Sequence, residues 1–221
     1  MNILLGFCNI VVIFSLVVLI EKFFKKEGIV VWVSIATIIA NLTVCKMIDI
    51  MSFTTSLGNV AFASTFLATD IISEKYGKDL AKKAVYLSIF AQISFLIITQ
   101  LSLLFIPSSE DIVHNSMKTL FGINIRTSIA SMGMFFIANM LDIYIYNKLR
   151  EKLPKQLWLR NNVATITCNC IENYFFNTLA FIGIFSVPVI ISIATTTTII
   201  EIVIAVCDTP FLYLSKYLSK N

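Results

Sequence analysis

Four acidic residues in long apolar stretches of this 221-residue sequence are expected to face the interior of a helix bundle: Asp70, Asp142, Glu172 and Glu201. If those stretches cross a membrane, each charge costs about 2.5–3.5 kcal/mol on insertion scales, so such side chains turn inward and mark a pathway or a binding site. The one basic residue in a comparable position is Lys46. An acidic interior suits a cation or a ligand rich in N–H donors, because a carboxylate accepts two parallel N–H bonds from an amidine-like edge.

The densest polar group is formed by Asn169, Glu172 and Asn173, whose spacing places them on one face of a helix. A Glu with a purely structural role at mid-membrane would need its own cation, and we expect Lys46 nearer the outer surface. We therefore interpret this group as part of a binding site. Glu201 lies near the centre of the last apolar stretch and joins the site on the same argument.

An aromatic stripe leads to two acids on one predicted helix face, which is formed by Phe62, Phe66, Asp70 and Glu74. Either acid could pair with a lysine of the adjoining basic loop, and for Glu74 we favour that pair. Asp70 lies further inside, and we favour a binding or gating role for it. Phe62 and Phe66, like Tyr174 and Phe175 elsewhere, would supply flat apolar walls for a ring.

Other polar positions leave alternatives open. Asp142 shares a predicted helix face with Asn139 and lies inside the inner boundary. Asn41 lies deep in the second apolar stretch, where a hydrogen bond between helices is the alternative to binding. Lys46 and Asp49 are three apart on the same predicted helix, and an ion pair and a functional role are equally open there.

The composition predicts that the apolar stretches do cross a membrane. The chain is 57% hydrophobic and only 14% charged, with a mean hydropathy of +0.86. Soluble domains are nearer half apolar and a quarter charged. A transmembrane barrel would alternate apolar and polar residues in short strands, whereas these runs are continuous and about 20 residues long, as a spanning helix requires. We predict an all-α, polytopic membrane helix bundle.

Seven apolar segments give the predicted topology. They run over about 3–20, 29–50, 54–74, 79–106, 125–147, 161–186 and 188–214. When they are threaded across a bilayer, all but three of the 17 Lys and Arg residues fall on one side, the exceptions being Lys46, Lys118 and Arg126. Because cytoplasmic loops are enriched in Lys and Arg, we predict an outer amino terminus and an inner carboxyl terminus. Residues 1–221 are predicted to form one membrane domain.

The cysteine and histidine pattern predicts no metal or cofactor. The five cysteines all lie in apolar segments, at Cys8, Cys45, Cys168, Cys170 and Cys207. There is no CxxC motif, and His114 lies in a polar loop. We therefore expect buried thiols rather than a zinc site or a disulfide framework. The net charge of +4 comes from short loops, so it indicates topology and not nucleic-acid binding.

Three blocks of the sequence carry a resemblance to a known family. They are FLATDIISEKYGKDLAKKAV at Phe66–Val85, NMLDIYIYNKLR at Asn139–Arg150 and WLRNNVATITCNCIENYFFNTLAF at Trp158–Phe181. Together with Asn41 in IIANLTVCKMI, they resemble the queuosine precursor transporter family, a group also described as putative vitamin uptake transporters. The resemblance covers about residues 30–215, and the LDxxxxNxLR pattern in the second block is its most specific part.

The resemblance implies a bacterial inner-membrane importer of 7-deazaguanines for tRNA queuosine salvage: the 7-cyano or 7-aminomethyl base, queuine or queuosine. Glu172 and Asn169 would contact the purine edge, while Asp70 and Asp142 would contact the substrate or gate the inner side. Glu201 stands near a position where the family tends to carry Lys, and the acid at 172 is more often Asp. The extra carboxylate favours an aminated substrate such as queuine. The full predicted site consists of Asn41, Phe66, Asp70, Asp142, Asn169, Glu172, Asn173 and Glu201.

Three alternatives accompany this interpretation. A substrate-binding membrane subunit of an ATP-driven energy-coupling-factor transporter would have an ATPase module as its partner. An intramembrane enzyme is disfavoured, because neither HExxH nor a Gly-x-Gly-Asp motif occurs. A scaffold with polar helix contacts alone would bind no deazaguanine. The energy source and the oligomeric state, including a homodimer, stay open.

Overall fold

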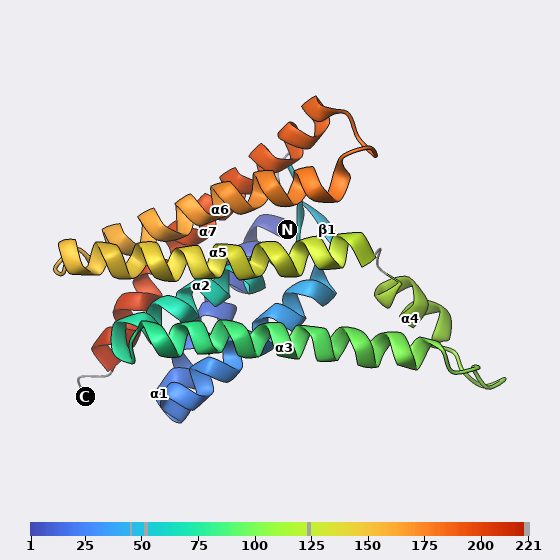
Figure 1. Cartoon of the computed structure of the whole chain (residues 1–221), viewed down its shortest axis with the longest axis horizontal. Coiled ribbons are helices and arrows are strands. Elements are labelled where there is room, and N and C mark those ends of the chain that lie inside the picture. Colours follow the sequence, from blue (N-terminus) through green and yellow to red (C-terminus); the bar gives the residue numbers. More distant parts are fainter. Residues whose placement is uncertain (45, 51–52, 123–124, 219–221) are drawn as a thin grey trace.

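A computed structural model describes residues 1–44, 46–50, 53–122 and 125–218, which form a helical bundle with one small hairpin (Figure 1). Its elements are α1 (Asn2–Thr43), β1 (Met47–Ile50), β2 (Phe53–Ser56), α2 (Gly58–Lys75), α3 (Lys78–Leu103), α4 (His114–Phe121), α5 (Ile125–Lys152), α6 (Leu157–Phe181) and α7 (Val187–Leu218). Cys45, predicted to be a buried thiol, and Lys220, assigned to the basic side, lie outside the described residues.

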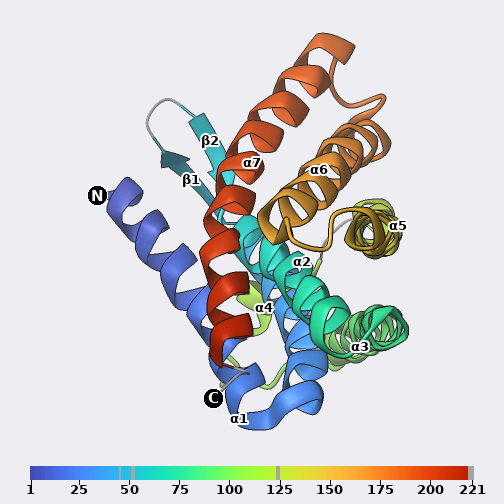
Figure 2. The same cartoon turned by 90° about the vertical axis from the view of Figure 1, so that its left-hand side faces the viewer.

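Helix α2 is the centre of the bundle. Every residue from Ala63 to Ser73 is buried, and the helix packs against α1, α3, α5 and α7. Figure 2 shows it with the other long helices arranged around it. A helix that is buried on all sides needs small residues where neighbours approach closely, and Ala61, Ala63 and Ala68 meet this need. The first predicted block, Phe66–Val85, therefore begins at the core of the molecule.

Helix α1 contains a sharp turn that the sequence analysis placed between two separate spans. Lys25 has a φ of 53° and interrupts the helical geometry, and the two halves of α1 form a V (Figure 2). Gly28 follows the turn, and a Cβ there would lie 2.5 Å from Cβ of Phe24. Only glycine fits this close approach. The predicted segments 3–20 and 29–50 are thus the two arms of one kinked element.

The turn is held by a buried ion pair. Glu21 is buried and accepts bonds from the Lys75 ammonium and the Tyr76 hydroxyl, each at 2.8 Å. Lys75 also donates to the carbonyl of Ser215 at 2.8 Å, which joins α1, α2 and α7. Burial and the adjacent Glu21 carboxylate raise the pKa of Tyr76 above its ordinary value. The first span is therefore fastened to the central helix at this end.

The prediction of helix up to residue 50 was wrong. Helix α1 ends at Thr43, and β1 pairs with β2 in an antiparallel hairpin whose register joins Met47 to Ser56. Lys46 is exposed before β1, and Asp49 belongs to the strand. The helix face that was expected to bring Lys46 and Asp49 together is therefore absent, and Lys46 is no buried cation.

The predicted outer loop contains the short helix α4. The carboxylate of Asp111 accepts bonds from the backbone N–H groups of Val113 and His114 at 2.9 and 3.0 Å, just before the helix begins. Such bonds satisfy N–H groups that have no partner within the helix. With eight residues, α4 is too short to span a bilayer.

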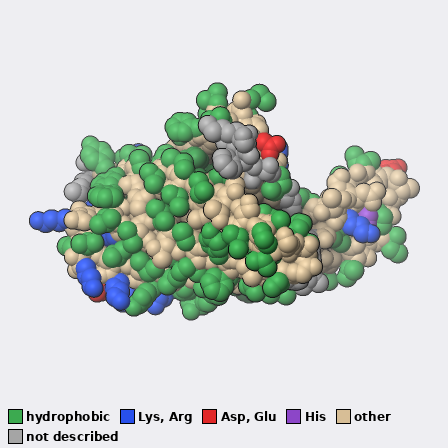
Figure 3. Space-filling model, turned by 90° about the horizontal axis from the view of Figure 1, so that it is seen from above, with side chains coloured by type: hydrophobic (Ala, Val, Ile, Leu, Met, Phe, Trp, Pro, Cys, Tyr) green, Lys and Arg blue, Asp and Glu red, His purple; other side chains and the backbone are tan. Residues whose placement is uncertain are grey.

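Four helical stretches of the described residues are long and apolar enough to cross a membrane: Asn2–Thr43, Lys78–Leu103, Ile129–Lys152 and Val187–Leu218. The all-α prediction is thus confirmed apart from the hairpin, with seven helices and these four candidate spans in the described part of the chain. Helices α2 and α6 fall outside this set, and both carry more polar and charged residues, such as Asp70, Glu74 and Lys75 of α2. Hydrophobic side chains cover much of the surface in Figure 3, while Lys and Arg gather at one end.

The Glu21 pair predicts a test of the fold. Glu21→Gln leaves the Lys75 ammonium, whose side chain is 11% exposed, without a counter-charge. We expect a loss of about 3 kcal/mol in stability, as is typical when one partner of a buried pair is removed. The melting temperature of the purified protein in detergent measures this loss. Glu27→Gln is the matched control, because Glu27 is 71% exposed and faces Lys26 at 3.7 Å; an equal effect of both substitutions would contradict the assignment.

Candidate functional site

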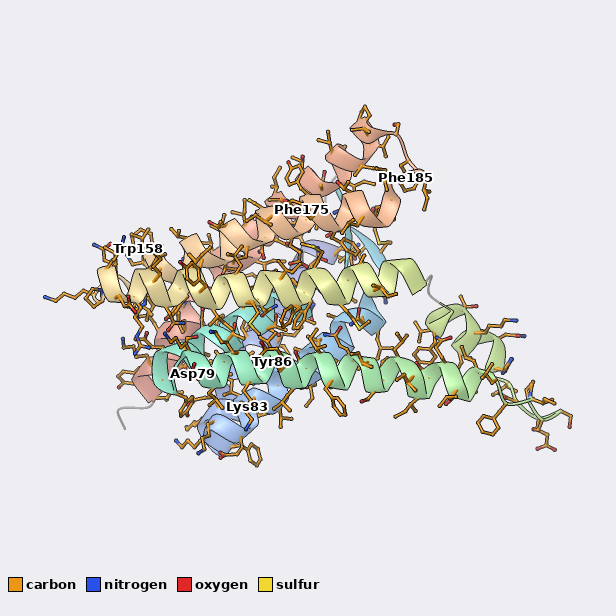
Figure 4. The ribbon with its side chains drawn as sticks, viewed as in Figure 1. Asp79, Lys83, Tyr86, Trp158, Phe175 and Phe185 are labelled. Atoms are coloured by element: carbon orange, nitrogen blue, oxygen red, sulfur yellow. The ribbon has the colours of Figure 1, made fainter. Side chains whose placement is uncertain are left out.

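A cavity of about 600 Å³ lies between the end of α1, the hairpin, the start of α2, the end of α6 and the start of α7. Helix α2 runs from this region to Lys75, and α6 arrives from the basic α5–α6 connection, so the cavity occupies the half of the bundle opposite the basic end. Figure 4 shows Asp79, Lys83 and Trp158 at that basic end and Phe185 at the cavity end. The volume suits a small organic molecule.

Two carboxyl groups lie at the inner part of this cavity. Glu172 of α6 and Glu201 of α7 both line it and interact electrostatically with one another. The Asn173 amide donates to the Glu201 carboxylate at 2.6 Å, whereas Oε2 of Glu172 has no hydrogen-bond partner among the described residues. No Lys or Arg is among the described residues of the lining. The cavity therefore presents two acidic groups, one of which has an oxygen without a donor from the described residues.

Amide groups line another part of the cavity. The Asn41 amide nitrogen lies 3.4 Å from the side-chain oxygen of Gln92 and donates to the carbonyl of Thr37 at 3.0 Å. Nε2 of Gln92 is buried and has no partner among the described residues. The sequence analysis missed Gln92, although a buried amide in an otherwise apolar span was the signal that could have found it. This wall offers both a donor and acceptors to a bound molecule.

Of the four predicted aromatic walls, Phe62 lines the cavity, whereas Phe66, Tyr174 and Phe175 do not. Phe62 lines the cavity and packs edge to face against Phe135, with ring centroids 5.8 Å apart. Phe66 is completely buried behind Phe62 and does not reach the cavity. On α6 the lining residue is Phe176, while Phe175 is 60% exposed and lies on the outer face of the helix (Figure 4). Tyr174 is likewise exposed, so neither Tyr174 nor Phe175 forms the predicted wall.

The structure thus divides the predicted site in two. Asn41, Glu172, Asn173 and Glu201 line the cavity. Phe66, Asp70, Asp142 and Asn169 are buried below it and are not part of its lining. Oδ1 of Asn169 has no hydrogen-bond partner among the described residues.

Three aspartates meet in this lower layer, one each from α2, α5 and α7. Asp70, Asp142 and Asp208 are fully buried. Asp142 accepts a bond from the Thr165 hydroxyl at 3.3 Å, and Asp208 accepts one from the Asn161 amide at 2.6 Å. Asp70 interacts electrostatically with Asp142 and Asp208, and neither of its carboxyl oxygens has a hydrogen-bond donor among the described residues.

At the basic end, Glu74 is surrounded by positive charge. It pairs with Arg160, with the Lys216 ammonium at 2.7 Å and with Nε of Arg150 at 3.5 Å, and it accepts a bond from the Tyr146 hydroxyl at 3.1 Å. The expected structural pair of Glu74 is therefore formed, although Arg150, Arg160 and Lys216 supply it in place of a lysine of the α2–α3 turn. Arg160, placed in a loop by the sequence analysis, is a buried cation in the first turn of α6.

Comparison with known proteins identifies the chain. The family described as "Putative vitamin uptake transporter" matches residues 56–215. A "Probable queuosine precursor transporter" of Bacillus subtilis (strain 168) is 35% identical over 210 residues, which cover 94% of this chain and 92% of that protein. This chain belongs to that transporter family.

More distant members of the transporter family match a shorter part. The "Queuosine precursor transporter" of Escherichia coli (strain K12) is 27% identical over 144 residues, and a "Probable queuosine precursor transporter" of Haemophilus influenzae is 24% identical over 144 residues. The aligned parts cover 62% and 57% of those two proteins. No solved structure matches.

Membership of the transporter family confirms two predictions. The chain is a multi-pass membrane protein and a transporter, not an enzyme. The family match begins at Ser56 and thus includes α2 to α7, with Glu172, Asn173 and Glu201, but not α1 with Asn41.

The Glu74 cluster predicts that substitutions of Arg160 and Glu74 have non-additive effects on stability. Arg160→Met leaves Glu74 with two half-exposed partners and costs about 3–5 kcal/mol of stability, because a buried pair loses one member. The double variant with Glu74→Leu removes both buried charges, and we expect most of that stability to return. Melting temperatures of the single and double variants in detergent measure the coupling. Additive effects of the two substitutions would contradict a direct pair.

Proposed function

We propose that this transporter imports queuosine precursors, 7-deazaguanines, and binds them in the cavity between α1, α2, α6 and α7. The observation that carries the proposal is the Glu172 carboxylate, which lines the cavity with one oxygen lacking a partner among the described residues. A guanine-like edge presents two parallel N–H donors, and a carboxylate accepts both. The names of the relatives supply the substrate class.

The rest of the cavity supports a flat, polar ring as ligand. Phe62, Phe135 and Phe176 offer aromatic faces, and Gln92 and Asn41 offer amide groups on another wall. The volume of about 600 Å³ lies within the range of small-molecule sites. Glu172 would contact the N–H edge, while the amides would bind carbonyl and ring-nitrogen acceptors.

We propose seven membrane crossings in a bacterial cell membrane, with the amino terminus outside and the carboxyl terminus inside. The two arms of α1 would cross separately, followed by α2, α3, α5, α6 and α7. Support comes from the bond that the Asn2 side chain donates to the carbonyl of Asp49 at 2.9 Å, because it holds the amino terminus beside the hairpin, away from the Lys25 turn. The cavity would then face the outer half of the membrane, as the entry site of an importer requires.

The neighbouring Glu201 supports an aminated substrate within this class. Two carboxylates in one cavity with no Lys or Arg in its described lining attract a positive charge. We infer that queuine or the 7-aminomethyl base binds more tightly than the neutral 7-cyano base. An ATPase module or a second copy of the chain as partner stays a prediction.

Replacing Glu172 tests the function. Glu172→Gln keeps the shape but converts an acceptor into a mixed donor and acceptor, and a hydrogen bond to a charged group contributes about 1.5–3 kcal/mol. We expect ten- to hundred-fold weaker binding of 7-deazaguanines to the purified protein and loss of uptake by cells that lack other importers. Glu110→Gln, at an exposed position between α3 and α4, is the control. Normal uptake by the Glu172 variant at normal expression would refute the proposal.

Replacing Glu201 tests the preference for an amine. Glu201→Gln removes one of the two charges, and we expect the affinity for queuine to fall about ten-fold while that for the 7-cyano base changes little. Competition between the two compounds for the purified variant measures the difference. An equal loss for both compounds would show that Glu201 does not select for charge.

A further inference from the structure

The buried aspartates below the cavity are not explained by substrate binding. Asp70 and Asp142 are fully buried, and neither lines the cavity. Asp142 and Asp208 are the acidic neighbours that interact electrostatically with Asp70. Neighbouring ionised carboxylates repel one another and are all acceptors, so a proton on one of them would both relieve the repulsion and supply a donor.

The donors around the pair leave most of its oxygens unused. Asp142 accepts one bond, from Thr165, through Oδ1. Both oxygens of Asp70, Oδ2 of Asp142 and Oδ2 of Asp208 have no donor among the described residues. Burying an ionised carboxylate without a partner costs several kcal/mol. The shortage of donors therefore favours a bound proton at this place.

The charged groups around the pair also favour a bound proton. Besides one another, Asp70 and Asp142 interact with titratable groups of three helices packed around them: Tyr146 of α5, Arg160 and Cys168 of α6, and Asp208 of α7. Arg160 is the one cation in this set, and its guanidinium already binds Glu74 and the carbonyl of Pro154. The described ranges contain no group of three or more His, Cys, Asp or Glu residues that could hold a metal ion.

The position of the pair connects the cavity to the basic end. Cys168 interacts with Glu172 on the cavity side and with both aspartates on the other. Tyr146 interacts with Asp70 and donates its hydroxyl to Glu74 at 3.1 Å. A series of polar groups thus leads from the cavity floor through the pair to Glu74 and its basic partners.

We propose that Asp70 and Asp142 form the proton-binding site that couples substrate import to the proton gradient. The inference rests on the proposed import function. The pair would take up a proton from the outer side through the cavity and release it toward Glu74. Helices α2 and α5 each supply one member of the pair. When the pair loses its proton, two negatively charged carboxylates repel each other across the contact between α2 and α5. That repulsion gives the protonated and deprotonated states different helix packing, which coupling requires.

One test reads the proton directly and needs no substrate. The infrared carbonyl-stretch band of a protonated carboxyl group is recorded on the purified protein in detergent at neutral pH. We expect a band that is lost in Asp70→Asn and in Asp142→Asn but kept in Asp79→Asn, the matched control at an exposed position of α3. A band that persists unchanged in both pair variants, or is absent from the unsubstituted protein, would overturn the proposal even if import is confirmed.

A second test measures whether a pH difference drives the accumulation of queuine in proteoliposomes. With the outer side one pH unit more acidic, one proton per substrate supports about ten-fold accumulation. We expect this from the unsubstituted protein, whereas the two Asn variants should exchange labelled for unlabelled queuine without accumulating it. Accumulation by both variants would overturn the coupling. Absence of any queuine binding or exchange by the unsubstituted protein would instead refute the proposed import function, and the infrared band would still decide the proton site.

Discussion

The cost of placing charge in an apolar bundle constrains the whole structure. An ionised side chain removed from water needs a counter-charge or several hydrogen bonds, since otherwise it costs several kcal/mol. Glu21 and Glu74 meet this need with Lys75 and with Arg160 and its neighbours. Glu172 and Asp70 do not meet it with groups of the described chain. The paired acids lie near the basic end, whereas the unpaired ones lie in the cavity and directly below it.

This separation distinguishes acids that hold the fold from acids that are available to a ligand. Glu74 ties α2 to α5, α6 and α7, because its partners come from all three helices. The basic end is therefore cross-linked by ion pairs. The cavity end is formed by the hairpin, the α6–α7 connection and the helix ends beside them. In the proposed orientation the cross-linked end would lie on the inner side, and the cavity would lie on the outer side, where a substrate enters.

Much of the site could be predicted from the sequence, because an acid within an apolar run is costly and so has a reason to be there. Glu172 and Glu201 were found in this way, Asn173 and Asn41 as polar side chains in apolar runs, and all four line the cavity. The depth of a residue along its helix was harder to predict from the sequence. Asp70 shares a helix with Phe62, but it lies two turns further on, and only the packing shows that the cavity ends before it.

The predictions that the structure contradicts, which concern the hairpin, Phe175 and Arg160, failed for physical reasons. The hairpin was missed because its residues continue an apolar run, and apolar runs do not separate strand from helix. Phe175 and Phe176 are neighbours on α6, and a rotation of 100° per residue decides which faces the cavity. Arg160 fell one residue before the predicted segment 161–186 and so in a loop, whereas α6 begins at Leu157 and carries it inward.

Helix α1 lies outside the family match, yet Thr37, Ala40 and Asn41 form one wall of the cavity. The matched segment therefore supplies the two acids of the cavity, and a helix outside it completes the enclosure. A substitution at Asn41 would then alter one wall of the cavity while Glu172 and Glu201 stay in place on α6 and α7.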